Sequence, residues 1–325
     1  MDQIFAQEHK KTVSCILHDR TPDDICFALL TDTRMSETSA ATAANIAAVD
    51  QEIGLDFLVH LGDLLEGTTS RYASEYILDH ELEKYRSCSR RQKLYVIPGE
   101  RDGYRDENFT GQLAYNIMTD TWWHDRTAYL NTYDSLVRPG NKPYYYVDIP
   151  EKQVRLIFLF SYTTDILEAD GLYEKYPVFD LEQISWLKHH ALAAPEGYSL
   201  MLFSHELPKS RFATGIDPFV YKGNSTEAVL YIVQQANQKN PVAAWIAGHY
   251  YCDAQVEVGG IQFAVINGQL PQFRTLAKCS DVICCTDRKT GTVNQDLWDV
   301  VLWNPKQRVI RFYRYGAGDD RVITY

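Results

Sequence analysis

The chain has 325 residues, of which 45% are hydrophobic and 23% are charged, and its formal net charge at pH 7 is −11. This composition is typical of a globular protein with a core of ordinary size. The negative charge argues against nucleic acid as a main partner, because phosphate backbones attract basic surfaces. No run approaches the roughly 18 consecutive apolar residues of a membrane span, so we expect no membrane-bound segment.

The seven cysteines are an odd number and contain no C-x-x-C pair. Cys284 and Cys285 are adjacent and cannot form an unstrained bridge with each other. Together these facts favour reduced thiols over a disulfide framework. The N-terminal stretch MDQIFAQEHKKTVSC has no apolar core of the kind found in signal peptides. We therefore expect a cytoplasmic protein.

The first part of the chain alternates between predicted strands and helices. Residues 1–23 are polar and mixed, and we expect a short N-terminal arm or edge strand there. The apolar run ICFALL at 25–30 predicts the first strand of a domain that spans 24–325, because no linker divides the rest of the chain. The Ala-rich stretch 39–53 has helical spacing, and Gly54 fits a C-terminal cap. The next predicted elements are a strand at 57–61, a helix at 70–88 and a strand at 94–97.

Residues 103–142 are aromatic and irregular, and we expect loops there. A Pro-Glu-Lys turn joins two apolar runs, 143–149 and 154–160, and predicts a hairpin. Helices are then predicted at 181–192 and 226–238, and strands at 199–204, 242–247, 255–266 and 298–315. Strand–helix alternation followed by hairpins indicates an α/β domain with mixed sheets.

Polar residues follow five of the predicted strands at the point where each strand ends. In chain order they are Asp32, Asp63, the run Glu100-Arg101-Asp102, His205 and His249. The carboxyl ends of several strands converge on one crevice in an open α/β sheet. Because carboxylates and imidazoles are ligands for divalent metals, the sequence predicts a metal site at this edge.

The order of these motifs resembles that of the calcineurin-like metallophosphoesterases, which show D-x-H, G-D, G-N-H-D, a lone H, and G-H-x-H. Here they read Asp32-Thr33-Arg34, Gly62-Asp63, Gly99-Glu100-Arg101-Asp102, His205, and Gly248-His249-Tyr250-Tyr251. The helix LEQISWLKHHAL is similar to the Q-x-x-W-L helix of that family. The resemblance implies a four-layer α/β/β/α sandwich of two mixed sheets flanked by helices.

The resemblance also implies two metal ions that share one carboxylate, which maps to Asp63. The other ligands of the first metal map to Asp32, Arg34 and Tyr251. Those of the second metal map to Glu100, His205 and His249. A guanidinium has no lone pair to donate, and a phenol with its usual pKa is a weak ligand. We therefore expect one divalent transition metal (Mn, Fe or Zn) or none, rather than two.

Three further residues have implied roles in catalysis. Arg34 can pair with Asp32 and Asp63, which would place a positive charge near the position of the first metal. Arg101 stands at the histidine of G-N-H-D and can bind phosphate through two N–H groups. Asp102 is expected to orient its neighbours. The alternative for both arginines is an ion-pair network in an inactive site, and Glu100 can pair with either arginine instead of binding metal.

The function that this resemblance implies is hydrolysis of a phosphomonoester or phosphodiester by a metal-activated water, with a small phosphate ester as substrate. The alternative is a catalytically inactive protein of the same fold that binds a phosphorylated ligand or partner. Segment 103–146 is a candidate for shaping substrate choice, because irregular loops on a rigid scaffold often do so. His60 lies inside an apolar run, and we expect it to be a hydrogen-bonded core residue.

Overall fold

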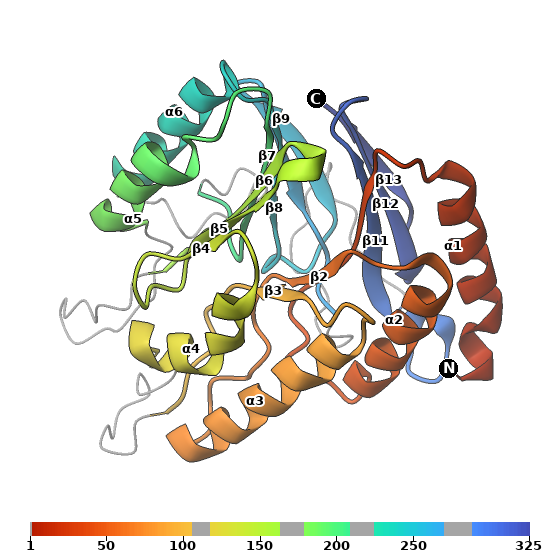
Figure 1. The fold of residues 1–325 in the computed structure, drawn as a ribbon. Coiled ribbons are helices and arrows are strands. Elements are labelled where there is room, and N and C mark those ends of the chain that lie inside the picture. Colours follow the sequence, from red (N-terminus) through yellow and green to blue (C-terminus); the bar gives the residue numbers. More distant parts are fainter. Residues whose placement is uncertain (1, 106–117, 163–178, 209–223, 270–287) are drawn as a thin grey trace, which may run out of the picture.

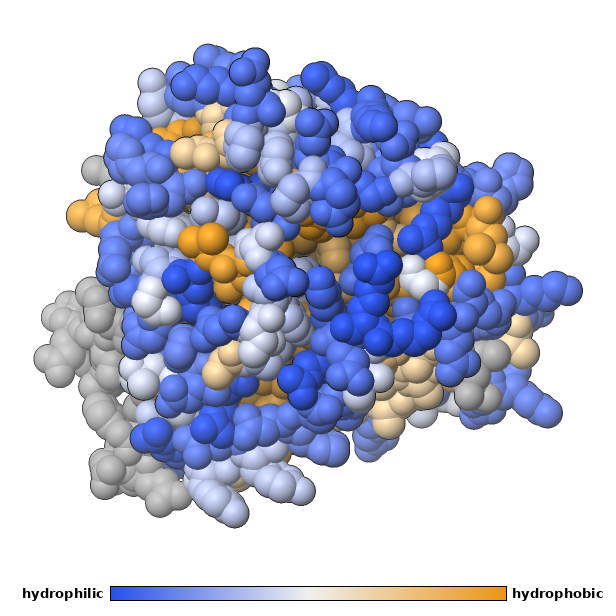
Figure 2. All heavy atoms as spheres, viewed as in Figure 1, coloured by the Kyte–Doolittle hydropathy of each residue, from blue (hydrophilic) through white to orange (hydrophobic). Residues whose placement is uncertain are grey.

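The structure is a computed structural model that describes residues 2–105, 118–162, 179–208, 224–269 and 288–325. Two mixed β-sheets lie face to face, and helices cover the outer side of each sheet (Figure 1). This is the predicted four-layer α/β/β/α sandwich. Figure 2 shows a largely hydrophilic face, with hydrophobic residues visible chiefly where the molecule is hollowed between the two layers.

The first sheet has the strand order β13-β12-β11-β1-β2-β3. The three strands β1, β2 and β3 run parallel, whereas β11 is antiparallel to β1. Parallel neighbours place their carboxyl ends at the same edge of the sheet, which is where a site can form. The bounds are β1 (Ile25–Leu30), β2 (Phe57–His60), β3 (Leu94–Val96), β11 (Leu297–Asn304), β12 (Val309–Gly316) and β13 (Arg321–Thr324).

The second sheet has the order β4-β5-β6-β7-β8-β10-β9. Its centre is parallel from β6 through β7 and β8 to β10, and antiparallel strands lie on both sides. The expected hairpin is formed by β5 and β6. The bounds are β4 (Leu136–Val137), β5 (Tyr145–Ile149), β6 (Val154–Phe158), β7 (Ser199–Ser204), β8 (Val242–Ala247), β9 (Ala254–Val258) and β10 (Ile261–Val265).

The main core lies between the two sheets. Every residue of β1, β7 and β8 is buried, as expected for parallel strands covered on both faces. Aromatic rings cross the gap between the sheets: the ring centroids of Phe27 and Phe203 lie 6.3 Å apart, and those of Tyr95 and Phe158 lie 5.4 Å apart. These contacts hold the two sheets, and the loops at their ends, in a fixed relation.

The expected helices are confirmed as α2 (Ser39–Ile53), α3 (Arg71–Ser87), α5 (Leu181–Trp186) and α6 (Asn224–Asn237). α2 ends at Gly54, whose φ of +67° is the left-handed conformation that glycine adopts at little cost. α5 continues through one wider turn, Leu187–Ala191. The Gln183 side chain on α5 makes two 2.8 Å hydrogen bonds with the backbone of Phe160, which attaches the helix to the end of β6.

Two segments differ from expectation. Residues 1–23 contain the helix α1 (Ala6–Asp19), which packs against α2 and β12, rather than an arm or edge strand. Its buried positions, 9, 12, 13 and 16, have the spacing of one helix face, but two of them are His and Thr, which hid the pattern. The domain boundary at residue 24 stays a prediction. In the aromatic stretch 103–142, the described part includes the short helix α4 (Asp120–Arg126).

Within the described part of the chain, no helix is long and apolar enough to cross a membrane. Cys15, Cys26, Cys88 and Cys252 are present there as thiols, and the other three cysteines lie outside the described residues. His60 is buried, with hydrogen-bond contacts to Thr33 Oγ1 at 3.0 Å and to the backbone nitrogen of Gly62 at 3.1 Å, so its expected structural role is confirmed.

Candidate metal centre

The expected polar residues follow the carboxyl ends of strands from both sheets. Asp32 follows β1, Asp63 follows β2, and His205 comes directly after β7. The structure brings these three together: one possible ligand atom from each lies within 4.8 Å of the others, and all three side chains are buried. Two carboxylates and an imidazole at this separation form a candidate site for a divalent cation.

His205 is held by its backbone neighbours in an orientation suited to a ligand. Its Nδ1 lies 2.6 Å from the carbonyl oxygen of Leu61, so Nδ1 carries the proton and donates it there. Its Nε2 then has a lone pair and lies 3.5 Å from Oδ1 of Asp63. A histidine that ligates a metal usually donates its other N–H to an oxygen in this way.

Asp32 has one satisfied and one unsatisfied oxygen. Its Oδ2 accepts hydrogen bonds from Thr31 Oγ1 at 2.7 Å and from the backbone N–H of His249 at 2.9 Å. Its Oδ1 is buried and accepts no hydrogen bond from any described residue. A buried carboxylate oxygen without a partner costs free energy, and a bound cation would remove that cost. The donor set therefore fits a divalent metal.

The electrostatics of Asp63 lead to the same conclusion. Burial, with the negative charges of Asp32 and Glu100 nearby, raises the pKa of Asp63 well above its usual range. Carboxylates this close to each other cannot all ionise at low cost. A divalent cation would counter the repulsion, because it is the largest local charge wherever it binds.

The backbone at the site is strained. Asp32, Asp63 and His249 have φ values of +53°, +56° and +67°, in the left-handed region that residues other than glycine seldom adopt. Such a conformation costs about 1–3 kcal/mol per residue and persists where the surrounding structure enforces it. The backbone of Gly99 lies directly against Asp63. Only glycine fits at position 99, because a Cβ there would lie 2.2 Å from Oδ1 of Asp63.

Asp102 organises the loop that carries Asp63. Its carboxylate accepts backbone N–H groups from Asp63 at 2.7 Å, Leu64 at 2.7 Å, Leu65 at 3.0 Å and Gly99 at 2.9 Å. Burial raises the pKa of Asp102, and several of these hydrogen bonds oppose that rise. These contacts are with the loop, and the role of Asp102 in orienting site residues stays a prediction.

His249 lies beside His205, and it has an acidic neighbour that sequence reasoning missed. Nδ1 of His249 is 3.3 Å from Nε2 of His205, and Nε2 of His249 is 3.9 Å from Oε1 of Glu206. The Glu206 carboxylate is buried and also accepts hydrogen bonds from the phenols of Tyr162 at 3.0 Å and Tyr250 at 3.4 Å. The one feature of the sequence that could have indicated this neighbour is the position of Glu206, a charged residue directly after His205.

Glu100 and Arg101 form a pair at the edge of the site. Nε of Arg101 lies 3.4 Å from Oε1 of Glu100 and 3.8 Å from Oδ2 of Asp63, and its backbone N–H donates to Oδ1 of Asp63 at 2.9 Å. The Arg101 side chain is 36% exposed, so an anion can reach it. The structure therefore contains the Glu100–Arg101 pairing that the sequence left open. Metal ligation by Glu100 stays a prediction.

Arg34 makes contacts that sequence reasoning did not anticipate. Its guanidinium forms an ion pair with Glu66 and donates a 3.0 Å hydrogen bond to the phenol of Tyr251. Its backbone N–H donates to the carbonyl oxygen of Asp63 at 2.9 Å. Pairing of the guanidinium with Asp32 and Asp63 remains a prediction. Glu66 is 32 residues from Arg34 in sequence, and no local pattern links the two.

The charge states of Arg34 and Tyr251 oppose metal ligation by either residue. Burial lowers the pKa of Arg34, but its hydrogen bond to Glu66 and its contacts with Tyr251 outweigh burial and raise that pKa above its usual value. Burial and the charges of Asp32 and Asp63 raise the pKa of the Tyr251 phenol far above its usual value. One side chain is a permanent cation and the other is a neutral phenol.

Comparison with known proteins was made for sequence and for structure. The sequence profile described as calcineurin-like phosphoesterase matches residues 27–253. No curated protein matches the chain.

Among solved structures, a dimetal phosphatase from Danio rerio has a TM-score of 0.59 and 14% identity, with 93% of this chain and 99% of that chain covered. GAP50, the anchor in the inner membrane complex of Plasmodium, has a TM-score of 0.47 and 13% identity, with 92% and 90% covered. The phosphopantetheinyl hydrolase from Mycobacterium tuberculosis has a TM-score of 0.42 and 10% identity, with 83% and 99% covered. At 14% identity the likeness to the Danio rerio phosphatase concerns the fold alone.

Proposed function

The chain belongs to the calcineurin-like phosphoesterase family, and from this membership and the candidate metal centre we propose that it hydrolyses a small phosphate ester with one divalent metal ion. The observation that carries the proposal is the buried group Asp32, Asp63 and His205, in which Oδ1 of Asp32 has no partner among the described residues. Mn, Fe and Zn suit this mixture of carboxylate and imidazole ligands.

The protein residues have distinct roles in this proposal. Asp32, Asp63 and His205 hold the metal, and His249 and Glu100 complete its ligand set. When bound there, the metal supplies Lewis-acid polarisation of a phosphoryl oxygen and lowers the pKa of a coordinated water. The surrounding structure that enforces the left-handed backbone of Asp32 and Asp63 keeps these two ligands fixed before substrate arrives.

Arginines supply the remaining positive charge. Arg101 is close to Asp63 and partly exposed, so its N–H groups can bind the oxygens of a phosphoryl group as negative charge develops on them. A guanidinium is not a general acid, so Arg101 cannot protonate a leaving group. We therefore expect turnover to favour activated esters such as nitrophenyl phosphates over alkyl phosphates.

Arg34 replaces a metal ligand in this account. It is buried and charged, and its partners Glu66 and Tyr251 hold it beside the loop of Asp63. A fixed guanidinium there gives part of the positive charge that the first metal of the resembled family would give. A second candidate function is an inactive protein of this fold that binds a phosphorylated ligand, with Arg101 as the partly exposed cation. In that case the pairing of the buried Arg34 with Glu66 is part of an ion-pair network that fills the site.

The two candidates are separated by hydrolysis of p-nitrophenyl phosphate with added Mn²⁺, compared between the wild type and His205→Ala. The enzyme account expects metal-dependent turnover in the wild type and loss of both metal uptake and turnover in the variant. His189→Ala is the matched control, because His189 is exposed on the wider turn after α5. If no hydrolysis occurs at any metal concentration while phosphate still binds, the binding function replaces the enzymatic one.

A further inference from the structure

A cavity lies between the two sheets at the end of the sandwich opposite to the candidate metal centre. It has a volume of about 250 Å³ and is lined at the starts of β1, β2 and β3 and at the end of β5. The candidate metal ligands follow the other ends of β1 and β2. The six residues of β1 alone span about 20 Å, so the cavity is a separate place in the fold.

The charges that line this cavity are incompletely paired. Asp56 forms an ion pair with Arg91 at 3.4 Å, and Asp148 binds Arg155 through both carboxylate oxygens. By contrast, the ammonium group of Lys93 and the carboxylates of Asp134 and Glu151 have no ion pair or hydrogen bond with any residue that the structure describes. Lys152 also lines the cavity, and its ammonium group donates to the backbone carbonyl oxygen of Pro22. Asp134 and Glu151 are exposed and Lys93 is half-buried, so these three groups are open to a ligand that enters the cavity.

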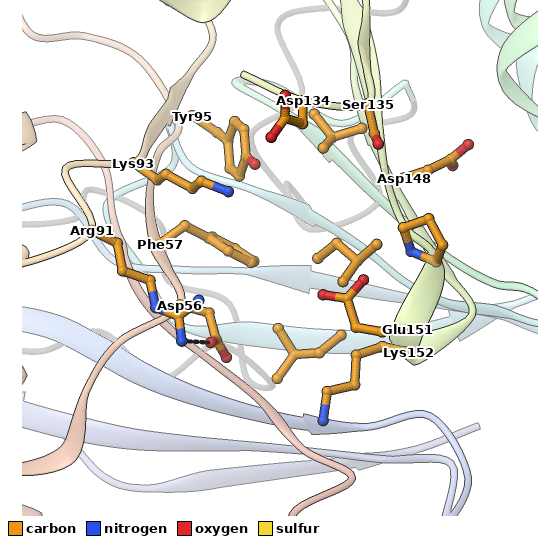
Figure 3. A pocket seen from close by; sticks show the side chains of 14 residues that line it. Asp56, Phe57, Arg91, Lys93, Tyr95, Asp134, Ser135, Asp148, Glu151 and Lys152 are labelled. Atoms are coloured by element: carbon orange, nitrogen blue, oxygen red, sulfur yellow. Dashed lines mark ion pairs between the residues drawn. The ribbon is translucent and has the colours of Figure 1, made fainter. Parts of the chain in front are cut away.

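The arrangement of these groups is directional. Figure 3 shows Lys93 on one side of the cavity and Glu151 on the other, with the ring of Phe57 near Lys93. Lys93 immediately precedes β3 of the first sheet, and Glu151 lies in the one-turn helix Pro150–Lys152 that follows β5 of the second sheet. A molecule that reaches both must present a negative group to Lys93 and a positive group to Glu151.

Tyr95 gives a second, independent indication that the cavity can hold a ligand. Its side chain lines the cavity and is buried, with only 2% of the residue exposed. Its ring packs on Phe57, with the centroids 5.1 Å apart, and on Phe158, which is a role that phenylalanine would fill equally well. Its hydroxyl makes no hydrogen bond to any described residue. Because this oxygen is not one of the buried polar atoms without a partner, it is open to the cavity, where a ligand can form a hydrogen bond with it.

The apolar residues that line the cavity indicate that the ligand also has an apolar part. The rings of Phe57 and Tyr95 and the side chains of Ile25 and Val147 form surfaces between the charged groups. The volume lies just below the roughly 300 Å³ at which pockets for drug-sized molecules begin, so the ligand is smaller than a drug. These facts together describe a compact zwitterion that also carries an apolar group.

We propose that this cavity binds a small zwitterion of the amino acid class. The ligand carboxylate pairs with Lys93, its ammonium group pairs with Glu151, and its apolar side chain lies against Phe57 within hydrogen-bonding reach of the Tyr95 hydroxyl. The cavity is independent of the candidate metal centre, so the proposal does not depend on the proposed phosphoesterase activity.

Isothermal titration calorimetry of the full chain with L-phenylalanine and L-leucine tests this proposal. The two probes are compared with 3-phenylpropionate, which lacks the amine, and phenethylamine, which lacks the carboxylate. We expect saturable binding of at least one amino acid and at least about tenfold weaker binding of both single-charge compounds, because each loses one charge-assisted contact. Equal affinity for all compounds would mean an unspecific apolar gap and would overturn the proposal.

Variants then assign the binding to this cavity. Lys93→Met and Glu151→Gln should each weaken amino acid binding about tenfold, and Tyr95→Phe should weaken it a few-fold without lowering the melting temperature. Lys239→Met is the matched control, since Lys239 is exposed at the end of α6, far along the chain from the lining residues. No saturable binding of either amino acid up to about 10 mM, or unchanged binding in all three variants, would refute the assignment.

Discussion

The guanidinium of Arg34 donates a 3.0 Å hydrogen bond to the phenol of Tyr251, although the two residues are 217 positions apart. They stand where the resembled motifs have two histidines, so the residues that replace the first metal's imidazoles bind each other. The contact gives the loops after β1 and β8 a link that needs no metal ion. It also explains how both replacements coexist: a buried cation and a neutral phenol are matched as donor and acceptor.

The double variant Arg34→His with Tyr251→His should bind one more divalent ion per chain than the wild type. Both changes remove a side chain that cannot ligate and introduce an imidazole that can. Metal content after loading with Mn²⁺ and gel filtration measures the gain. Arg34→His alone should gain little, because the neutral Tyr251 phenol remains. An unchanged metal content in the double variant would show that the two positions do not form a latent site.

Arg101→Ala should reduce kcat/KM for p-nitrophenyl phosphate by about 10- to 100-fold, because one charged donor to the transition state is lost from a partly exposed position. Metal content should stay the same, since Arg101 donates and does not ligate. Arg71→Ala is the control, because Arg71 is an exposed residue on α3 whose ion pair with Glu75 lies on the helix surface. A loss of metal in Arg101→Ala would show instead that Arg101 holds the metal ligands in position.

Asp102→Asn should lower the free energy of unfolding by about 2–4 kcal/mol. The carboxylate accepts four backbone N–H groups through two oxygens, and an asparagine offers one oxygen and turns an N–H₂ toward the remaining donors. Urea denaturation measures the loss. Asp319→Asn, at an exposed position near the C-terminus, should stay within about 0.5 kcal/mol. Equal stability of the two variants would disprove the organising role of Asp102.

His60 should make the protein sensitive to acid. Burial and the neighbouring His205 lower the pKa of His60 from 6.5 to about 3. The unfolded chain therefore binds a proton that the folded chain rejects, and stability falls as the pH drops from about 6.5 toward about 3, by up to about 1.4 kcal/mol per pH unit. Unfolding measured between pH 7 and 4 should show a shallower slope in His60→Gln than in the wild type. In His189→Gln, at an exposed position, the slope should not change.

The sequence predicted the parts of this fold that local patterns encode. The strands β1, β7 and β8 are continuous apolar runs because both of their faces are covered, and such runs are visible without a structure. The order of polar residues after the strands indicated the convergence of Asp32, Asp63 and His205. The helix α1 was missed because His9 and Thr12 occupy its buried face.

The partners within the site could not be predicted in the same way. Glu66 is matched to Arg34, and Glu206 to His249, only after loops from different strands are brought together. A side-chain pair across loops has no spacing rule comparable to the helix or strand period. The same holds for the opposed charges of Lys93 and Glu151, which lie next to strands of different sheets.

The metal content of the wild-type chain tests the central claim most directly. Protein purified without chelator and loaded with Mn²⁺ is analysed by inductively coupled plasma mass spectrometry, and anomalous scattering from its crystals locates the ions. We predict one ion per chain, bound by Asp32, Asp63 and His205, with the Arg34 guanidinium still hydrogen-bonded to Tyr251. Two ions bridged by Asp63, or none at any metal concentration, would contradict the account.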